Sequence, residues 1–347
     1  MTWTKEMPKN PVVAIAGATG AVGEEFLNVL HDLDFPAAEV RALASSRSAG
    51  KLVPFKGCGL VPAGNLVVQE MTPESFEGVD IALFSAGAAI SKEMREAVTA
   101  AGAIMIDNSS AFRMDEDVPL IVPEVNPQDI SWHNGVIANP NCSTIQMVVA
   151  LKPLYELGGG IKRVIVSTYQ AASGAGARGM QELYNQTREF LDDEELTVSA
   201  FAHQIAFNCI PHIDVFMDDD YTKEEWKMVV ETKKIFGDDS IAVAPTCVRV
   251  PVLRCHAESI NVELKQPVSM DDVKAAFAAA EGVIVMDNPD EKLYPMPGLL
   301  QGTIGTFVGR IRQDPTVENG VAFWCVADQV RKGAALNAVQ IAQLLLP

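Results

Sequence analysis

The sequence predicts an α/β protein of two domains, in which a mainly parallel sheet is followed by an α+β domain. Three observations predict this fold class. Short apolar strands alternate with amphipathic helices in the first half, which favours a parallel sheet with helices on both faces. After the stretch Gly158-Gly-Gly160 the expected strands become longer, as in a larger mixed sheet. The length of 347 residues also suits two domains of roughly 100–200 residues each.

Hydrophobic periodicity predicts the individual elements. In the first half we expect strands at 12–16, 40–44, 81–84 and 103–106, and helices at about 22–33 and 90–101. In the second half we expect strands at 162–168, 248–253 and 259–264, and helices at 145–157, 179–191 and 222–235. A last amphipathic helix, about 333–346, is expected to return to the first domain. The predicted domains are therefore 1–140 together with 330–347, and 141–329.

Acidic residues dominate the charge of the chain. Lys and Arg number 27 against 45 Asp and Glu, which gives a formal net charge of −18. This balance argues against a general nucleic-acid binder, because phosphate contacts require a basic face. An anionic ligand is still allowed if a few cations gather at one place against the overall field. We expect the surplus acid in surface segments such as 192–195 and 218–220.

The sequence carries no signal for export or for a membrane. The first eleven residues lack the apolar core of a secretory signal, and no run of about 18 apolar residues suggests a span. Six cysteines are scattered without a CxxC pair, which argues against a zinc site or a disulfide framework. We therefore expect a cytoplasmic protein with free thiols and no metal.

A glycine-rich turn, Gly17-Ala-Thr-Gly-Ala-Val-Gly23, follows the first expected strand and opens the first helix. Glycines there allow a tight turn and a close approach of the backbone to a pyrophosphate at the helix N-terminus. The spacing is GxxGxxG rather than the standard GxGxxG, so an ordinary glycine turn is the alternative. The strand–turn–helix context favours a Rossmann-type dinucleotide-binding domain.

The end of the second strand indicates which dinucleotide binds. NAD sites usually carry an acidic residue there for the ribose 2′-hydroxyl, whereas this chain has Ser45-Ser-Arg-Ser48. An arginine among hydroxyls suits a 2′-phosphate, through charge-assisted hydrogen bonds from Arg47. A solvated basic turn is the alternative. We predict NADP as the cofactor.

Asn139-Pro-Asn-Cys-Ser-Thr144 is the strongest chemical signal in the chain. It lies between a strand and an apolar helix, so Cys142 is expected near a helix N-terminus, where the dipole favours a thiolate. Such a thiolate is a candidate nucleophile. The alternative is a buried cysteine that acts as a small apolar residue.

The segment 249–256 supplies further candidates. His256 is a candidate acid–base residue, although a single histidine can equally be structural, and Arg249 is a candidate fork for a carboxylate. A hydride cofactor, a cysteine nucleophile and a histidine together suit thiohemiacetal formation, hydride transfer and release of an acyl group. These residues therefore predict an acylating aldehyde dehydrogenase.

At these residues the chain closely resembles the aspartate-semialdehyde dehydrogenase family, over essentially its full length. The resemblance is carried by seven stretches in the family's order: 17–23, 108–113, 139–144, 169–176, 224–227 with 231–235, 249–256 and 328–335. It implies the interconversion of L-aspartate 4-semialdehyde, phosphate and NADP with 4-phospho-L-aspartate (aspartyl phosphate) and NADPH. This reaction is an early step toward lysine, methionine, threonine and isoleucine. The resemblance also implies a homodimer formed through the sheet of the second domain.

The resemblance also implies roles for individual residues. Cys142 would be the nucleophile, His256 the acid–base residue, and Gln170 the side chain that orients the acyl intermediate. The substrate-binding residues would be Asn141 beside the nucleophile, Arg249 for the α-carboxylate, Glu224 for the amino group, and Arg113 and Lys227 for the phosphate. The cofactor-binding residues would be Gly17, Thr19, Gly20, Ala21, Val22, Ser46, Arg47, Ser173, Gly174 and Gln329.

Several alternatives stay open at this point. Lys227 can belong to a solvated helix face, and Arg113 can form a surface ion pair with the acidic run 115–117. Gln329 stands where many relatives have Asn, and the segment 54–65 with Cys58 is longer than in close relatives and has no functional explanation.

Three alternatives compete with the favoured activity. N-acetyl-glutamyl-phosphate reductase shares the fold plan and a Cys/His pair, but Arg249 with Glu224 favours a free amino acid. A non-catalytic relative acting as a binding protein would have lost Cys142 or His256. A short-chain reductase or nucleotide-sugar epimerase would need a Tyr-x-x-x-Lys pair, which the sequence lacks.

Overall fold

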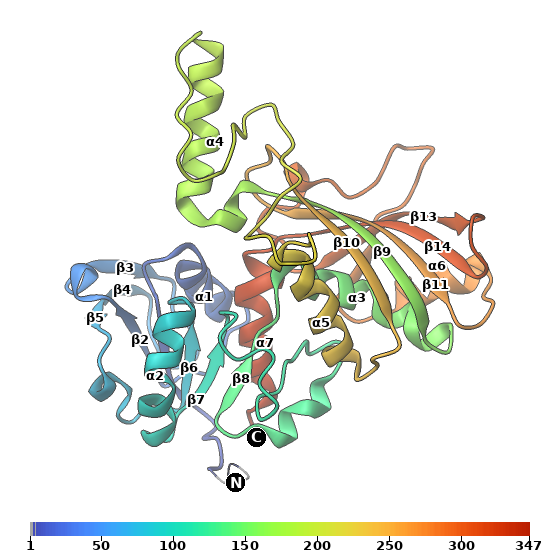
Figure 1. The fold of residues 1–347 in the computed structure, drawn as a ribbon. Coiled ribbons are helices and arrows are strands. Elements are labelled where there is room, and N and C mark those ends of the chain that lie inside the picture. The colour runs from blue at the N-terminus through green and yellow to red at the C-terminus, as the bar shows by residue number, and fades with distance from the viewer. Residues whose placement is uncertain (1–2, 4) are drawn as a thin grey trace. The chain divides into compact units, whose positions relative to one another are not determined.

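The computed structural model describes residue 3 and residues 5–347 of the chain (Figure 1). Two compact units are built around separate sheets: residues 1–141 with 334–347, and residues 142–333. The C-terminal helix α7 (Leu336–Leu344) follows a short π-helical turn at Arg331–Ala335 and belongs to the first unit.

The first unit contains a six-stranded parallel sheet in the order β5-β2-β1-β6-β7-β8. Its strands are β1 (Val12–Ala16), β2 (Glu39–Ala44), β5 (Gln69–Glu70), β6 (Ile81–Phe84), β7 (Ile104–Asp107) and β8 (Val136–Ala138). The sheet grows in opposite directions from β1, through β2 on one side and β6 on the other. Dinucleotides bind at such a switch point, beyond the carboxyl ends of the strands.

Helices cover both faces of this parallel sheet. α1 (Ala21–Asp32) and α7 pack together over the face that carries Val13, Ile15 and Leu83. On the other face, beside α2 (Ala88–Ala100), Phe84 stacks on Phe76 with ring centroids 5.7 Å apart. The predicted doubly covered parallel sheet is confirmed.

A small antiparallel ribbon explains the segment 54–65. Strands β3 (Leu52–Phe55) and β4 (Gly64–Val67) pair across it. Between them Cys58 is buried in the same core as α1, and the carbonyl oxygen of Gly57 lies 2.7 Å from Nδ1 of His31. The segment therefore extends the core of the first unit.

The second unit contains a six-stranded mixed sheet in the order β10-β9-β11-β14-β13-β12. Its strands are β9 (Ile161–Gln170), β10 (Ala242–Arg249), β11 (His256–Leu264), β12 (Val283–Val285), β13 (Thr306–Asp314) and β14 (Gly320–Ala327). β9 is parallel to β10 and antiparallel to β11. A mixed sheet in this half was predicted and is confirmed.

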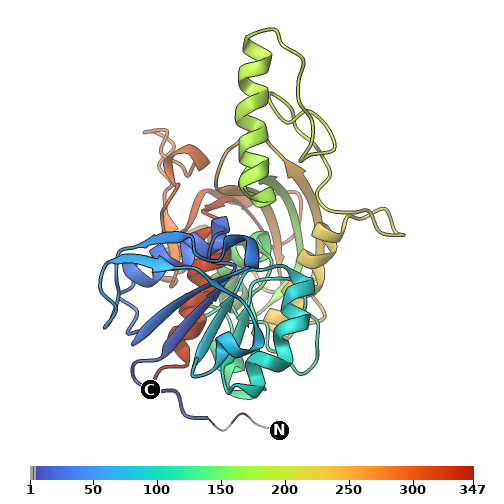
Figure 2. The same cartoon turned by 90° about the vertical axis from the view of Figure 1, so that its left-hand side faces the viewer.

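The two faces of the mixed sheet differ. One packs against α3 (Cys142–Leu157), α5 (Lys223–Phe236) and α6 (Met270–Ala279) around an apolar core. On the other face Ile165 and Tyr169 are exposed, and Tyr169 lies against Trp324 with ring centroids 5.2 Å apart. α4 (Gly176–Leu191) stands away from the sheet in both views (Figures 1 and 2).

The expected strand at 248–253 is wrong at both ends, because β10 begins at Ala242 and ends at Arg249. Pro251 has no N–H to donate to a ladder, and Cys255 has a φ of +75°, in the left-handed region that strands do not use. Residues 250–255 therefore form an irregular turn, and β11 begins at His256, three residues earlier than expected.

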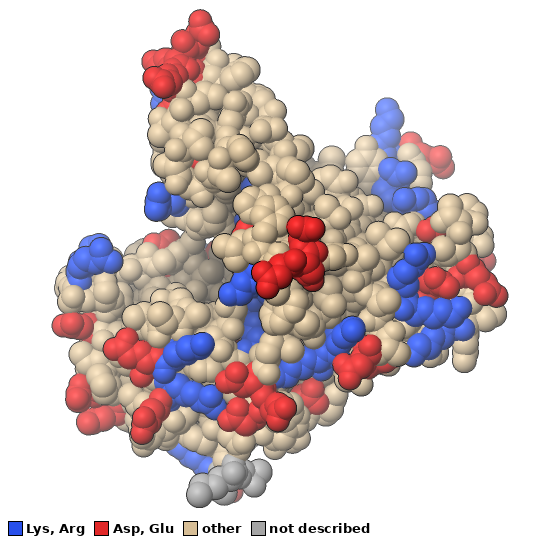
Figure 3. Space-filling model, viewed as in Figure 1, with Lys and Arg blue, Asp and Glu red and all other residues tan. Residues whose placement is uncertain are grey.

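The acidic segments 192–195 and 218–220 are exposed. Acidic side chains gather at the far end of α4 (Figure 3). Within residue 3 and residues 5–347, no helix has the length and apolar character needed to cross a membrane.

The glycine turn yields a stability prediction. A Cβ at Gly23 would lie 2.1 Å from the carbonyl oxygen of Gly17 and 2.7 Å from Cα of Ala18, and both obstacles are backbone. Gly23→Ala should therefore lower the free energy of unfolding by roughly 1–3 kcal/mol, measured by urea denaturation. Gly64→Ala, which meets no atom within 4 Å, is the matched control. Equal stability of the two variants would contradict the prediction.

Candidate active site

Cys142 is the first residue of α3 and is partly exposed. The positive end of the helix dipole and the N–H groups of the first turn favour an anionic sulfur there. The guanidinium of Arg249 adds to this, because its positive charge and the Cys142 thiolate attract one another. A Cβ at Gly333 would lie 3.0 Å from Cβ of Cys142, so the backbone of Gly333 closes one side of the site.

The buried cysteines have the opposite environment. Burial raises the pKa of Cys58 to about 11 and that of Cys255 to about 12. Burial also raises the pKa values of Cys247 and Cys325. These thiols stay protonated at neutral pH, whereas the thiolate is the nucleophilic form.

His256 is the first residue of β11 and is fully buried. The N–H of Ala171 donates to its Nδ1 over 3.0 Å, so Nε2 carries the proton of the neutral ring. Burial lowers the pKa of His256 well below its usual value, and the positive charge of Arg249 lowers it further. His256 therefore presents a neutral Nε2–H group.

Gln170, the last residue of β9, lies beside this histidine, with its Nε2 atom 3.5 Å from Nε2 of His256. The hydroxyl of Thr168 donates to Gln170 Oε1 over 3.0 Å, and Gln170 Nε2 donates to Glu224 Oε1 over 3.1 Å. Both ends of the amide are held, so its orientation is fixed before any substrate arrives.

Glu224 and Lys227 lie in the first two turns of α5. The helix begins with a capping box in which Glu225 and Thr222 bond one another's backbone N–H groups. Lys227 Nζ donates to Glu224 Oε2 over 3.0 Å and to Asp214 Oδ2 over 2.8 Å. The charge of Glu224 and the hydrogen bond to Asp214 raise the pKa of Lys227 against the effect of burial. Lys227 is therefore part of a partly buried charge cluster, not of a solvated helix face.

Arg249 is buried at the end of β10. Its Nη1 donates to the carbonyl oxygen of Ala171 over 2.6 Å, and the guanidinium lies 5.8 Å from the ring centre of Phe201. A Cβ at Gly174 would lie 2.6 Å from Nη1 and 3.2 Å from Cε1 of His256. Glycine at 174 is what allows this close packing.

Ser173 and Gln329 are joined within the second unit. The Gln329 side chain donates from Nε2 to the hydroxyl of Ser173, while its Oε1 accepts from the N–H of Cys255 over 2.9 Å. Ser173 lies in a 3-10 turn, Ala172–Ala175, directly after Gln170 and Ala171. Gln329 thus holds this turn against the residue that precedes His256.

The first unit carries the other predicted cofactor residues. Gly17 has a φ of +92°, and a Cβ on it would lie 2.4 Å from the carbonyl oxygen of Ser85, which follows β6. Gly20 is the N-cap of α1, and no described side chain caps that end. Thr19, Ala21 and Val22 complete this turn, which fits a pyrophosphate through backbone N–H groups at a helix N-terminus.

Ser46 and Arg47 lie in a 3-10 turn, Ser46–Ser48, just beyond β2. Both are exposed, and in the part of the chain that the structure describes Arg47 forms no ion pair. An uncommitted guanidinium at the end of β2 suits a ribose 2′-phosphate.

Arg113 is buried in the first unit and donates to the carbonyl oxygens of Asn139 and Asn108, each over 2.9 Å. The nearby acids Asp115 and Asp117 accept hydrogen bonds from Arg95. Asn141 is also buried and directly precedes Cys142 in the chain.

The structure therefore brings six predicted residues into one cluster within the second unit: Cys142, Gln170, Gly174, Glu224, Arg249 and His256. Sequence reasoning missed Thr168 and Asp214, which hold Gln170 and Lys227. Thr168 could have been found, because it lies two residues before Gln170 and therefore on the same face of the strand. Asp214 has no such signal.

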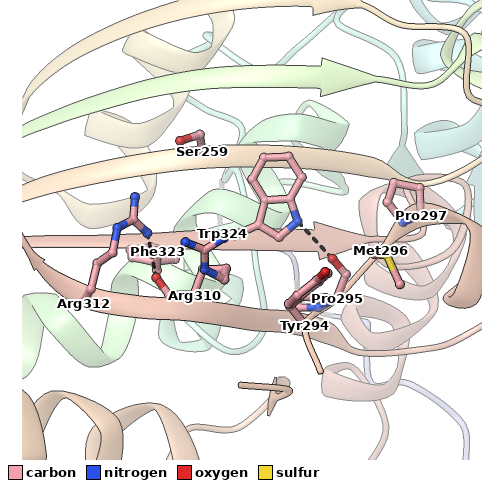
Figure 4. Close-up of a pocket in the computed structure, with 9 residues that line it drawn as sticks. All are labelled: Ser259, Tyr294, Pro295, Met296, Pro297, Arg310, Arg312, Phe323 and Trp324. Atoms are coloured by element: carbon pink, nitrogen blue, oxygen red, sulfur yellow. Dashed lines mark hydrogen bonds between the residues drawn. The ribbon is translucent and has the colours of Figure 1, made fainter. Parts of the chain in front are cut away.

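A separate pocket of about 380 Å³ opens in the second unit (Figure 4). Trp324 Nε1 donates to the carbonyl oxygen of Pro295 over 3.0 Å at its wall. None of the predicted site residues lines it. In the described part of the chain no cluster of His, Cys, Asp and Glu suits a metal ion.

The charge cluster on α5 predicts a pH-dependent stability. Lys227→Met should lower the free energy of unfolding at pH 7 by roughly 1–3 kcal/mol, because Glu224 loses its cation. Lys227 lowers the pKa of Asp214 in the folded protein. The ion pair of Lys227 with Asp214 therefore stabilises the fold above the unfolded pKa of Asp214, about 4, and this stabilisation is lost as the pH falls through the folded pKa of Asp214. The pKa of Lys227 is raised, so the stability that Lys227 contributes is present at lower pH and is lost only above about pH 10.

Urea denaturation of wild type and Lys227→Met between pH 3 and pH 9 measures this difference. The gap should be constant from about pH 5 to pH 9 and shrink below about pH 4. The control is Lys223→Met, at an exposed position on the same helix. A gap that does not change with pH would show that the charges contribute nothing.

Comparisons with known proteins identify the family. A family model described as the NAD-binding domain of semialdehyde dehydrogenase matches residues 12–133, and one described as the dimerisation domain matches residues 151–332. The aspartate-semialdehyde dehydrogenase of Aquifex aeolicus is 54% identical over 96% of this chain and 97% of its own length. That of Bacillus subtilis is 50% identical over 96% of each chain.

Solved structures give the same result. Aspartate-semialdehyde dehydrogenase II of Vibrio cholerae, solved in complex with ASA, has a TM-score of 0.93 and 48% identity, and covers 97% of this chain and 98% of its own. The Candida albicans enzyme, solved with NADP, has a TM-score of 0.74 and 27% identity, with 97% and 98% covered. The family and the dehydrogenase activity predicted from the sequence are confirmed: the chain belongs to the aspartate-semialdehyde dehydrogenase family.

Proposed function

We propose that the protein reduces 4-phospho-L-aspartate to L-aspartate 4-semialdehyde, with release of phosphate, through a thioester on Cys142. The observation that carries this proposal is the cluster in the second unit. A cysteine at a helix N-terminus is attracted to Arg249, beside a neutral histidine and an amide held at both ends. Acyl transfer needs such a nucleophile together with fixed donors for the oxygen that becomes charged.

In the first step the Cys142 sulfur attacks the acyl carbon, and the carbon–oxygen bond to phosphate breaks. When bound, NADPH supplies the hydride that adds to the thioester carbon. The resulting oxyanion re-forms the carbonyl and expels the Cys142 thiolate, which releases the semialdehyde. His256 meets this oxygen with its Nε2–H, and we assign its acid–base role to that atom. Gln170 orients the acyl group.

Charge complementarity supports the assignment of the substrate groups. A buried guanidinium such as Arg249 suits the α-carboxylate, and Glu224 suits the amino group. Lys227 and Arg113 are proposed for the phosphate, with Asn141 beside the nucleophile. NADP would bind at the Gly17–Val22 turn and Ser46–Arg47 of the first unit, and at Ser173, Gly174 and Gln329 of the second.

Assembly and domain roles are part of the same proposal. Residues 1–140 and 330–347 would bind NADP, and residues 141–329 would carry catalysis and form a homodimer. The exposed Ile165 and Tyr169 on the open face of the second sheet and the family description of this region as a dimerisation domain support the dimer. Free thiols agree with the cytoplasm, where we expect the enzyme to work.

The covalent step gives an activity prediction. The purified protein should reduce NADP when given aspartate semialdehyde and phosphate, and Cys142→Ser should lower kcat by at least about 10³-fold because it removes the nucleophile. Cys209→Ser, at an exposed cysteine, is the control and should be fully active. N-acetylglutamate semialdehyde, tested in parallel, separates this function from N-acetyl-glutamyl-phosphate reductase. Normal turnover by Cys142→Ser would exclude the thioester route.

Cofactor choice gives a second prediction. Arg47→Ala should raise the KM for NADP roughly 10–100-fold, the value of a charge-assisted hydrogen bond of about 1.5–3 kcal/mol, and leave the KM for NAD nearly unchanged. Lys56→Ala removes another exposed cation of the first unit and controls for general electrostatics. If Arg47→Ala weakens both cofactors equally, Arg47 does not bind the 2′-phosphate.

A further inference from the structure

Glu258 is a fully buried carboxyl group that the proposed chemistry does not use. It lies two residues after His256 on β11, so both side chains point to the helix-covered side of the sheet. Thr168 of β9 and Cys325 of β14 are its partners in the neighbouring strands. The amide of Gln146, from α3, lies next to the carboxyl and favours its ionised form, but burial outweighs this effect and raises the pKa of Glu258.

Acceptor atoms outnumber donors at this place. Among the described residues, neither carboxyl oxygen of Glu258 nor Oε1 of Gln146 has a partner in hydrogen-bond geometry. The hydroxyl of Thr168 already donates to Gln170. The thiol of Cys325 donates to the backbone carbonyl oxygen of Gln146 over 3.9 Å. Buried acceptor oxygens that lack a donor in hydrogen-bond geometry are costly in a protein interior. One proton on Glu258 supplies the missing donor.

The surroundings of Glu258 also oppose a charge there. Burial raises its pKa well above the usual value, and no described Lys or Arg forms an ion pair with it. Cys325 and Cys247 lie near Glu258 as neutral thiols, and a negative charge on Glu258 would raise their pKa values. On the same strand His256 is neutral, because burial lowers its pKa. The acids Glu224 and Glu225 beside Cys247 add only negative charge.

We propose that Glu258 is a positioning residue, a neutral carboxylic acid whose O–H donates to Gln146 Oε1. The Gln146 amide in turn donates from Nε2 to the carbonyl oxygen of His256 over 3.5 Å. Gln146 lies one helical turn after Cys142 on α3. The chain of bonds therefore ties the helix that begins with the nucleophile to the strand that begins with the histidine. The inference rests on the roles proposed above for Cys142 and His256.

A neutral acid is suited to this position for a chemical reason. An ionised carboxylate in this low-dielectric interior would oppose a thiolate at Cys142 and favour a protonated His256. A protonated carboxyl gives the same directional hydrogen bond without a charge. An amide in its place should therefore preserve function, and an apolar side chain should not.

Four variants test the proposal: Glu258→Gln, Glu258→Leu, Gln146→Leu and the Glu258→Leu/Gln146→Leu double variant. Glu258→Gln should keep kcat within about threefold, with a pH profile of kcat from pH 6 to pH 9 that superimposes on that of wild type. Glu258→Leu should lower kcat about tenfold, the value of one hydrogen bond, with a smaller change in KM. In the double variant the two losses should not add. A loss of kcat above about 30-fold in Glu258→Gln, or a shifted profile, would mean that Glu258 works as a charged group.

Infrared spectroscopy of the substrate-free protein is the second measurement, and it does not depend on activity or on the folding of Glu258→Leu. The wild type at pH 7 should show the C=O stretch of a protonated carboxylic acid, which disappears in Glu258→Gln. The absence of that band in the wild type overturns the proposal even if the enzyme is active. Its presence in a protein inactive toward aspartate semialdehyde would instead sink the proposed function and leave the protonated Glu258 in place.

Discussion

The register of strand β9 is the constraint on which the cluster depends. β9 pairs in parallel with β10, which places Arg249 beside Gln170, and antiparallel with β11, which places Tyr169 opposite Ala257 and so brings His256 to the end of β9. The buried Val164 and Val166 lie on the same face as Gln170. A slip of one residue would expose this whole set, so the apolar core that fixes the strand also orients the amide of Gln170.

The polar side chains in the interior of the second unit are connected by a series of hydrogen bonds. Thr168 bonds Gln170, Gln170 bonds Glu224, Glu224 bonds Lys227, and Lys227 reaches Asp214 near the surface. In a low-dielectric setting each member is costly unless its neighbour is correctly placed. The series therefore resists rearrangement. A donor held in this way, such as the amide of Gln170, needs no reorganisation when charge develops on a bound acyl group.

Sequence analysis predicted the elements that depend on a local pattern of residues. β1 and β6 were predicted to the residue because each is an uninterrupted apolar run. Cys142 was expected at a helix start because the segment 139–144 lies between an expected strand and an apolar helix. The limits of β10 and β11 were missed, since the left-handed Cys255 between them has no sequence signal comparable to a glycine. The link from Lys227 to Asp214, and that from Glu258 to Gln146, depend on packing between elements, which periodicity along one element does not contain.

The net charge of −18 is compatible with anionic substrates because the charges act over different ranges. The exposed acids at 192–195 and 218–220 are screened over about 8 Å at physiological ionic strength, whereas buried Arg249 acts through low-dielectric protein. Lys227 is already balanced by Glu224 and Asp214, so it adds little positive potential by itself. A substrate ammonium bound at Glu224, as in the proposed function, would share the negative charge that balances Lys227, and Lys227 would then attract a phosphate more strongly. The amino-group and phosphate positions are then coupled through a single carboxylate.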